Sequence, residues 1–257
     1  MMNKEPLVSI VMPAYNCGKY IKESIQSVID QTYRNWELII IDDNSTDNTK
    51  EIIASFKDTR IKYHRNSNNY GVAKARNKGI NISGGVFIAF LDSDDYWKNT
   101  KLYKQINLTK KGYDFIFTGS GYTDEEGREY GYVLTVPEKI NKNELLKQNL
   151  ISCSSVLISK NLLKDNYFVE ETKYMIHEDY VLWLTILDKI EFAYSINEPL
   201  LIYRIRGNSK SSKKIEAAIM NWNALKHCEI NFFVSCKYMI IYCCRGINKY
   251  LKIRGSV

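Results

Sequence analysis

Residues 86–96, VFIAFLDSDDY, decide how the rest of the sequence is interpreted. The run VFIAFL is continuous, apolar and rich in strand-forming residues, which is typical of a strand buried on both faces of a parallel sheet. Three carboxylates, Asp92, Asp94 and Asp95, follow it directly. Ligands of open α/β sheets bind just beyond the carboxyl ends of the strands. The junction between apolar strand and acidic loop therefore predicts a ligand site.

Crowded carboxylates repel one another unless a positive group lies among them. Carboxylate oxygens suit Mg²⁺ or Mn²⁺, and such ions are often shared with the phosphates of a substrate. The same residues could equally form a solvated acidic turn, and an isolated D-x-D pattern does not decide between these interpretations. The neighbouring segments are needed to choose between a metal site and a solvated turn.

The first part of the chain alternates strand and helix four times. The predicted strands are residues 7–12, 36–41, 61–64 and 86–91, and apolar residues at helical spacing lie between them. This alternation predicts an α/β fold with a mostly parallel central sheet flanked by helices. We expect one domain over residues 1–212, with residues 1–97 as its ligand-binding half and residues 98–212 as its second half.

The pattern is less regular after residue 97. GSGYTDEEGREYG, residues 119–131, is rich in turn-forming residues. The elements expected in this half are helices over 98–110, 141–149 and 180–187, and strands over 114–117, 152–159, 191–196 and 200–205.

The net charge of +7 is concentrated in the last part of the chain, where residues 210–257 hold nine basic and two acidic residues. We expect residues 213–257 to form a basic, helical tail. Residues 230–244, INFFVSCKYMIIYCC, are apolar but too short to span a bilayer. This composition suits an amphipathic helix on an anionic membrane surface. The alternative is a helix that packs on the preceding domain.

Other features limit the partners and the compartment. The aromatic residues of the tail lie in an aliphatic run rather than a basic groove, which argues against nucleic-acid binding. The six cysteines contain no C-x-x-C pair, so neither a zinc site nor a redox motif is indicated. The N-terminal residues lack the apolar segment of a signal peptide. We expect a reduced cytoplasmic protein that lies peripherally on the inner face of the cytoplasmic membrane.

Polar and aromatic residues also follow the first and second predicted strands. Asp42 and Asp43 could accept a hydrogen bond from a nucleotide base or a ribose hydroxyl, or could form an Asx turn that caps the next helix. A base could lie across Pro13, Ala14 and Tyr15. The sequence lacks both G-x-G-x-x-G and G-x-x-x-x-G-K-[ST], which argues against a nicotinamide dinucleotide site and a P-loop.

Two later positions carry charges next to apolar helices. Arg76 could pair with the acidic loop or with a phosphate, or could lie on a solvated helix face. Glu178 and Asp179 open an apolar helix. They could act as a general base, although acidic residues are favoured at a helix N-terminus in any case.

Four segments, taken in order, resemble the family 2 glycosyltransferases of bacterial surface-polysaccharide synthesis. They are VSIVMPAYNCGKYIKESIQSVIDQTYRNWELIIIDDNSTDNT (8–49), GVAKARNKGINISGGVFIAFLDSDD (71–95), HEDYVLWL (177–184) and YRIRGNSKSS (203–212). The resemblance implies a glycosyltransferase-A fold, a nucleotide-diphosphate sugar donor, Mn²⁺ or Mg²⁺ as cofactor, and inversion at the anomeric carbon. It favours a UDP-sugar as donor and a lipid-linked saccharide as acceptor.

The resemblance also implies roles for single residues. Pro13, Ala14 and Tyr15 border the base, and Asp43 binds the uracil or its equivalent. Asp92 and Asp94 form the D-x-D pair, with Asp94 in direct contact with the metal and Asp92 nearer the ribose. Asp179 is the catalytic base, with Glu178 as the alternative.

Arg206 departs from the pattern, because the family often has His there. Arginine cannot ligate a cation, but it can pair with the diphosphate.

Two other functions remain open from the sequence. The chain could be a non-catalytic relative that binds a nucleotide sugar or docks with partner transferases, although the intact Asp94 and Asp179 argue against this. It could also be a metal-dependent phosphohydrolase with Asp92 as nucleophile.

Overall fold

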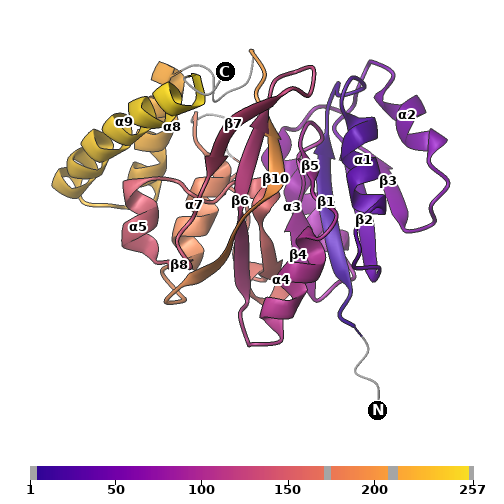
Figure 1. Cartoon of the computed structure of the whole chain (residues 1–257), viewed down its shortest axis with the longest axis horizontal. Helices are drawn as coiled ribbons and strands as arrows, with labels where there is room; N and C mark the ends of the chain where they lie inside the picture. Colours follow the sequence, from indigo (N-terminus) through magenta and orange to yellow (C-terminus); the bar gives the residue numbers. More distant parts are fainter. Residues whose placement is uncertain (1–4, 171–174, 208–213, 255–257) are drawn as a thin grey trace.

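The structure is a computed structural model that describes residues 5–170, 175–207 and 214–254, and the side chains of residues 214 and 247–254 are not described. Within these ranges ten strands form one sheet, flanked by helices (Figure 1). The strand order is β3-β2-β1-β4-β9-β6-β10-β5, with β7 paired to β6 and β8 paired to β10. The predicted α/β fold is confirmed.

The N-terminal half of the sheet is parallel and follows the expected elements closely. Its strands are β1 (Val8–Ala14), β2 (Trp36–Asp42), β3 (Ile61–Arg65) and β4 (Phe87–Phe90), and its helices are α1 (Ile21–Ile29), α2 (Thr49–Ser55) and α3 (Val72–Ile82). Strands β1 and β2 are buried along their whole length, as their continuous apolar runs require. Asp42, Asp43 and the D-x-D loop therefore lie at the same edge of the sheet.

The second half is a mixed sheet, in which β9 is antiparallel to both β4 and β6. Its strands are β5 (Tyr96–Trp97), β6 (Phe115–Thr123), β7 (Glu129–Leu134), β8 (Lys139–Ile140), β9 (Leu157–Ser159) and β10 (Ala193–Arg204). Its helices are α4 (Lys101–Thr109), α5 (Lys142–Lys147), the 3₁₀ turn η1 (Cys153–Ser155), α6 (Lys160–Leu163) and α7 (Glu178–Ile186).

Three expectations for this half differ from the structure. Residues 119–131, which are rich in turn-forming residues, keep a turn only over residues 124–128, between β6 and β7, and a Cβ at Gly119 would meet the backbone oxygen of Leu134 at 2.8 Å. The strand expected over 152–159 begins as a 3₁₀ turn, in which Ser155 Oγ donates to Ser152 O at 2.7 Å. The two strands expected over 191–205 are one strand, β10, whose register with β6 shifts around Pro199.

One expected helix cap also differs. An Asx turn on Asp42 or Asp43 was one expectation for the cap of the second helix, but α2 begins at Thr49 after Asn48. The Ser45 amide donates to Asp42 Oδ1 at 2.8 Å, and Asn44 has a positive φ of 68°. The Asp42 side chain therefore holds a turn that ends several residues before the helix starts.

Apolar packing places the two helices that carry charged residues. Gly79 of α3 lies so close to β1 that a Cβ there would meet Val11 Cγ1 at 2.4 Å. In α7, the Trp183 ring packs against the rings of Phe90, Phe115 and Phe168, with centroids 5.2 to 6.1 Å apart. These contacts place α3 and the start of α7 on the same face of the sheet, next to the end of β4.

The C-terminal helices pack on this domain. They are α8 (Lys214–His227) and α9 (Phe232–Arg254), and Figure 1 shows them beside α5 and α7 at the side remote from β3. Ala224 and Leu225 of α8 are fully buried in the main core, and Tyr238 and Met239 of α9 pack against it. In the part of the chain that the structure describes, no helix is long and apolar enough to cross a membrane. The tail is thus packed on the domain, while Phe232 and Phe233 remain exposed.

Candidate active site

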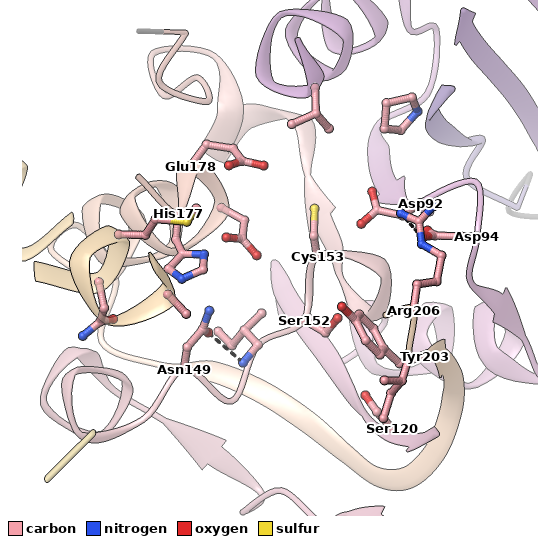
Figure 2. Close-up of a pocket in the computed structure, with 18 of the residues that line it drawn as sticks. Asp92, Asp94, Ser120, Asn149, Ser152, Cys153, His177, Glu178, Tyr203 and Arg206 are labelled. Atoms are coloured by element: carbon pink, nitrogen blue, oxygen red, sulfur yellow. Dashed lines mark hydrogen bonds and ion pairs between the residues drawn. The ribbon is translucent and has the colours of Figure 1, made fainter. Parts of the chain in front are cut away.

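A cavity of about 1680 Å³ lies beyond the carboxyl ends of the parallel strands. Ten of the residues singled out from the sequence line it, namely Pro13, Ala14, Tyr15, Asp43, Arg76, Asp92, Asp94, Glu178, Asp179 and Arg206, whereas Asp42 and Asp95 do not. Figure 2 shows His177 and Glu178 on one side, Asp92, Asp94 and Arg206 on the other, and Cys153 between them. The fold thus gathers residues from widely separated parts of the sequence into one site.

Arg76 is buried between two carboxylates. Its Nη2 donates to Asp92 Oδ1 at 2.6 Å, and its Nη1 donates to Glu178 Oε1 at 2.7 Å. Burial disfavours the charged guanidinium, but the carboxylates of Asp92 and Glu178 outweigh it and raise the pKa of Arg76 well above its usual value. Of the interpretations open from the sequence, pairing with the acidic loop is the one seen. Arg76 thereby joins the D-x-D loop to the start of α7.

Asp94 is paired with the arginine that departs from the family pattern. Asp94 Oδ2 lies 2.7 Å from Arg206 Nη2. Burial and the neighbouring Asp92 raise the pKa of Asp94, and Arg206 opposes this rise. Because the two carboxylates repel each other, any cation bound between them would be stabilised.

Asp95, the third carboxylate of the loop, is almost fully buried. It accepts hydrogen bonds from Ser154 Oγ at 2.7 Å and from the Arg204 amide at 3.1 Å. Burial, Asp94 and Asp92 raise the pKa of Asp95 well above its usual value. Asp95 therefore has a structural role, because these hydrogen bonds hold the loop against η1 and β10.

Two residues that hold the acidic loop, Arg204 and Ser154, were not predicted from the sequence. Arg204 Nε donates to the backbone oxygen of Asp94 at 3.0 Å, and its Nη2 pairs with Glu23. A signal for Arg204 was present, because alternate residues of a strand share a face and Arg206 was already a candidate. No pattern in the sequence indicates that Ser154 reaches Asp95.

Two neighbouring carboxylates, Asp42 and Asp43, lie near the part of the cavity expected to hold the nucleotide base, and their contacts differ. Asp42 is fully buried and accepts hydrogen bonds from Tyr63 and the Ser45 amide, so its role is structural. Asp43 accepts from Asn66 Nδ2 at 2.8 Å and from the Gly71 amide at 2.6 Å, yet it lines the cavity. Tyr15 lies on the same cavity with 48% of its surface exposed. This part of the wall offers an exposed ring beside an oriented carboxylate.

Asp179 lies in the first turn of α7, where the Trp183 packing fixes it. Burial and the neighbouring Glu178 raise the pKa of Asp179, while His177 and Arg76 lower it. A carboxylate with a raised pKa is a stronger base than an ordinary aspartate, which suits proton abstraction. Glu178 is instead engaged by Arg76.

The residues present fit a divalent cation that takes part of its coordination from a substrate. Among the described residues, no group of three or more His, Cys, Asp or Glu side chains could hold a metal ion. Asp92 and Asp94 nevertheless provide two neighbouring carboxylates on the cavity wall. Magnesium and related ions are commonly bound by one or two carboxylates together with substrate phosphates.

Replacing Arg76 with Met should be strongly destabilising. The change leaves Asp92 and Glu178 without their cation, and breaking a buried ion pair typically costs about 3–5 kcal/mol. Urea unfolding of Arg76→Met beside wild type, with exposed Arg128→Met as the matched control, measures this cost. A loss of less than about 1 kcal/mol for Arg76→Met would show that Arg76 does not hold the two segments together.

Comparison with known proteins places the chain in a family. Residues 9–165 match the model of glycosyl transferase family 2. The chain is 34% identical to a putative teichuronic acid biosynthesis glycosyltransferase, TuaG, of Bacillus subtilis, over 98% of this chain and 100% of the relative. It is 38% identical to the UDP-Glc:alpha-D-GlcNAc-diphosphoundecaprenol beta-1,3-glucosyltransferase WfaP of Escherichia coli, over 95% of each chain.

A solved structure supports the fold independently. The crystal structure of S. aureus TarS 1–349 in complex with UDP-GlcNAc matches with a TM-score of 0.69 at 19% identity, over 95% of this chain and 72% of that one. Because the family model covers most of the chain and the relatives align along nearly all of it, the chain belongs to glycosyltransferase family 2.

Proposed function

We propose that this glycosyltransferase moves a sugar from a UDP-sugar to a hydroxyl of a lipid-linked saccharide, with inversion, during surface-polysaccharide synthesis. The observation that carries the proposal is the single cavity that contains the Tyr15–Asp43 wall, the Asp92–Asp94 pair and Asp179. The named relatives support the substrate classes, because WfaP is described as using UDP-Glc and a diphosphoundecaprenol-linked sugar. We propose residues 1–212 as the catalytic part and residues 213–257 as a tail whose helices α8 and α9 pack on it.

The donor is proposed to lie along the parallel-strand edge of the cavity. Its base stacks near Tyr15, beside Pro13 and Ala14, and hydrogen-bonds to Asp43, which Asn66 and Gly71 hold in place. A divalent ion held by Asp94 and Asp92 would stabilise the negative charge that develops on the leaving diphosphate. Arg206 provides a second positive charge there, and its planar guanidinium suits phosphate oxygens.

The acceptor is proposed to approach from the α7 side of the cavity. Asp179 then accepts the proton of the attacking hydroxyl, while the hydroxyl oxygen bonds to the anomeric carbon and the sugar–phosphate bond breaks. A single displacement of this kind inverts the anomeric configuration. Arg76 keeps Glu178 engaged, which leaves Asp179 as the carboxylate available for the proton.

Replacement of Asp179 by Asn should abolish turnover while donor binding is kept. Loss of a general base typically lowers the rate about 10²–10⁴-fold. We expect kcat to fall by that factor and the KM for UDP-glucose to change less than about threefold, measured with a diphosphoundecaprenol-linked N-acetylglucosamine acceptor. Glu178→Gln serves as the comparison, and a larger kcat loss there than in Asp179→Asn would contradict the assignment.

Arg206 should compete with the metal for Asp94, because its guanidinium already contacts the carboxylate. We expect Arg206→Gln to lower the Mn²⁺ concentration for half-maximal activity about threefold or more at pH 8, and also to lower kcat. Arg206→Lys keeps the charge and should resemble wild type in its Mn²⁺ requirement. An unchanged Mn²⁺ requirement in Arg206→Gln would contradict the competition.

The pH dependence should follow from the raised pKa of Asp94. Only the ionised carboxylate binds a cation, so Mn²⁺ binding to the wild type should weaken as the pH falls through the raised pKa. The same titration repeated at lower pH checks this direction.

We propose, as a part of the function, that the tail binds an anionic membrane surface. Phe232 and Phe233 at the start of α9 are 62% and 80% exposed, and the basic residues Lys226, Lys237 and Arg245 of α8 and α9 are exposed as well. Apolar side chains flanked by basic ones favour binding at the interface of anionic lipids. Such binding would bring the cavity to a lipid-linked acceptor.

Removal of the two phenylalanine rings should weaken membrane binding. We expect Phe232→Ser/Phe233→Ser to lower the partitioning onto phosphatidylglycerol vesicles by about tenfold or more, because each ring loses its apolar burial. Val86→Ser, which alters an exposed apolar residue on the other half of the sheet, is the control. Equal sedimentation of all three proteins with the vesicles would contradict the proposal.

A further inference from the structure

The cavity extends beyond the charged residues into an apolar arm. On one side α8 contributes Ile215, Ala218, Ile219 and Trp222 to its wall. On the same side α9 contributes Met239, Tyr242, Cys243 and Gly246. Both sets include the spacing i, i+3, i+4, i+7 of one helix face, and α8 also contributes Ala217, Met220 and Asn221. The two helices thus present mostly apolar residues to the same cavity.

The facing wall is also apolar and begins at the charged site. It is formed by Tyr130 and Leu134 of β7 and by Tyr203 and Ile205 at the end of β10. Ile205 directly precedes Arg206, whose guanidinium contacts Asp94. The apolar arm and the proposed donor site are therefore parts of one cavity.

Two large apolar side chains in this arm are exposed among the residues that the structure describes. Ile215 is 80% exposed and Ile219 is 43% exposed, although both line the cavity. A contiguous exposed apolar surface beside a reactive site is a feature of ligand and lipid contact. Nothing in the catalytic role of the carboxylates requires these side chains.

The arm leads toward the surface that we propose to meet the membrane. Trp222 lines the cavity, and its ring makes an edge-to-face contact with Phe232, with centroids 5.9 Å apart. Phe232 in turn contacts Phe233. The aromatic side chains thus connect the cavity wall to the exposed apolar start of α9.

We propose that this apolar arm binds the first isoprenoid units of the acceptor, a polyprenyl diphosphate that carries the sugar. The inference rests on the proposed function, because it takes the acceptor to be lipid-linked. The sugar hydroxyl lies at Asp179, and the lipid leaves along the faces of α8 and α9 toward the bilayer. The protein then selects its acceptor by the lipid as well as by the sugar.

Binding of sugar-free prenyl diphosphates to the full chain tests the inference without requiring transfer. The probes are dimethylallyl, geranyl and farnesyl diphosphate, each below its micelle concentration, with affinity followed by tryptophan fluorescence. Because each buried methylene group adds to the affinity, we expect farnesyl diphosphate to bind at least about tenfold tighter than dimethylallyl diphosphate.

Variants locate the binding within the arm. Ile215→Asn and Ile219→Asn should weaken farnesyl diphosphate binding about fivefold or more and leave dimethylallyl diphosphate binding unchanged. Ile240→Asn is the matched control, because Ile240 is 67% exposed on α9 but does not line the cavity. All three positions are exposed, so thermal unfolding should remain close to wild type.

Two results would overturn the inference. One is an affinity that does not depend on chain length. The other is an equal loss in Ile219→Asn and Ile240→Asn, which would show adsorption to the outer surface. Absence of sugar transfer from every member of a panel of UDP-sugars would contradict the proposed function instead, and chain-length-dependent binding would still support the apolar arm.

Discussion

The site depends on how three arginines pair with a cluster of neighbouring carboxylates, most of them partly buried. Arg76 bridges Asp92 and Glu178, and Arg206 pairs with Asp94. Arg204 holds the loop through the backbone oxygen of Asp94 and pairs with Glu23. Without these cations, the carboxylates that follow β4 and open α7 would repel one another with no positive group among them. The arrangement keeps a strongly acidic cavity intact before any metal or diphosphate arrives.

Apolar packing supplies the geometry that the charges alone could not. Gly79 lets α3 lie directly against β1, which brings Arg76 to the end of β4. The Trp183 cluster holds α7 so that Glu178 and Asp179 begin their helix at the cavity. At the other end of the cavity, α8 and α9 present apolar faces beside the same carboxylates. One fold thereby joins a polar site for a nucleotide sugar to an apolar path for a lipid.

The first half of the fold could be predicted because its strands are continuous apolar runs that end in polar turns, as in LVSIVM followed by Pro13 and VFIAFL followed by Asp92. The second half was harder to predict, because the same residues are compatible with a turn and with an irregular strand. Gly119 lies in a segment expected to be turn but permits close strand packing, and the gap expected between strands 191–196 and 200–205 is a register shift around Pro199 within β10. The site residues were predictable one by one, whereas the links between them were not. Which carboxylate Arg76 binds, or that Ser154 reaches Asp95, depends on packing between distant segments.

The central claim is that one nucleotide diphosphate binds with its base at Asp43 and its diphosphate at a metal ion held by Asp92 and Asp94. Crystals grown with UDP and Mn²⁺, measured at the manganese absorption edge, test it most directly. The account predicts an anomalous peak in contact with Asp94 and the diphosphate, with the uracil beside Tyr15 and Asp43. UDP bound elsewhere on the protein, or manganese bound away from Asp92 and Asp94, would contradict it.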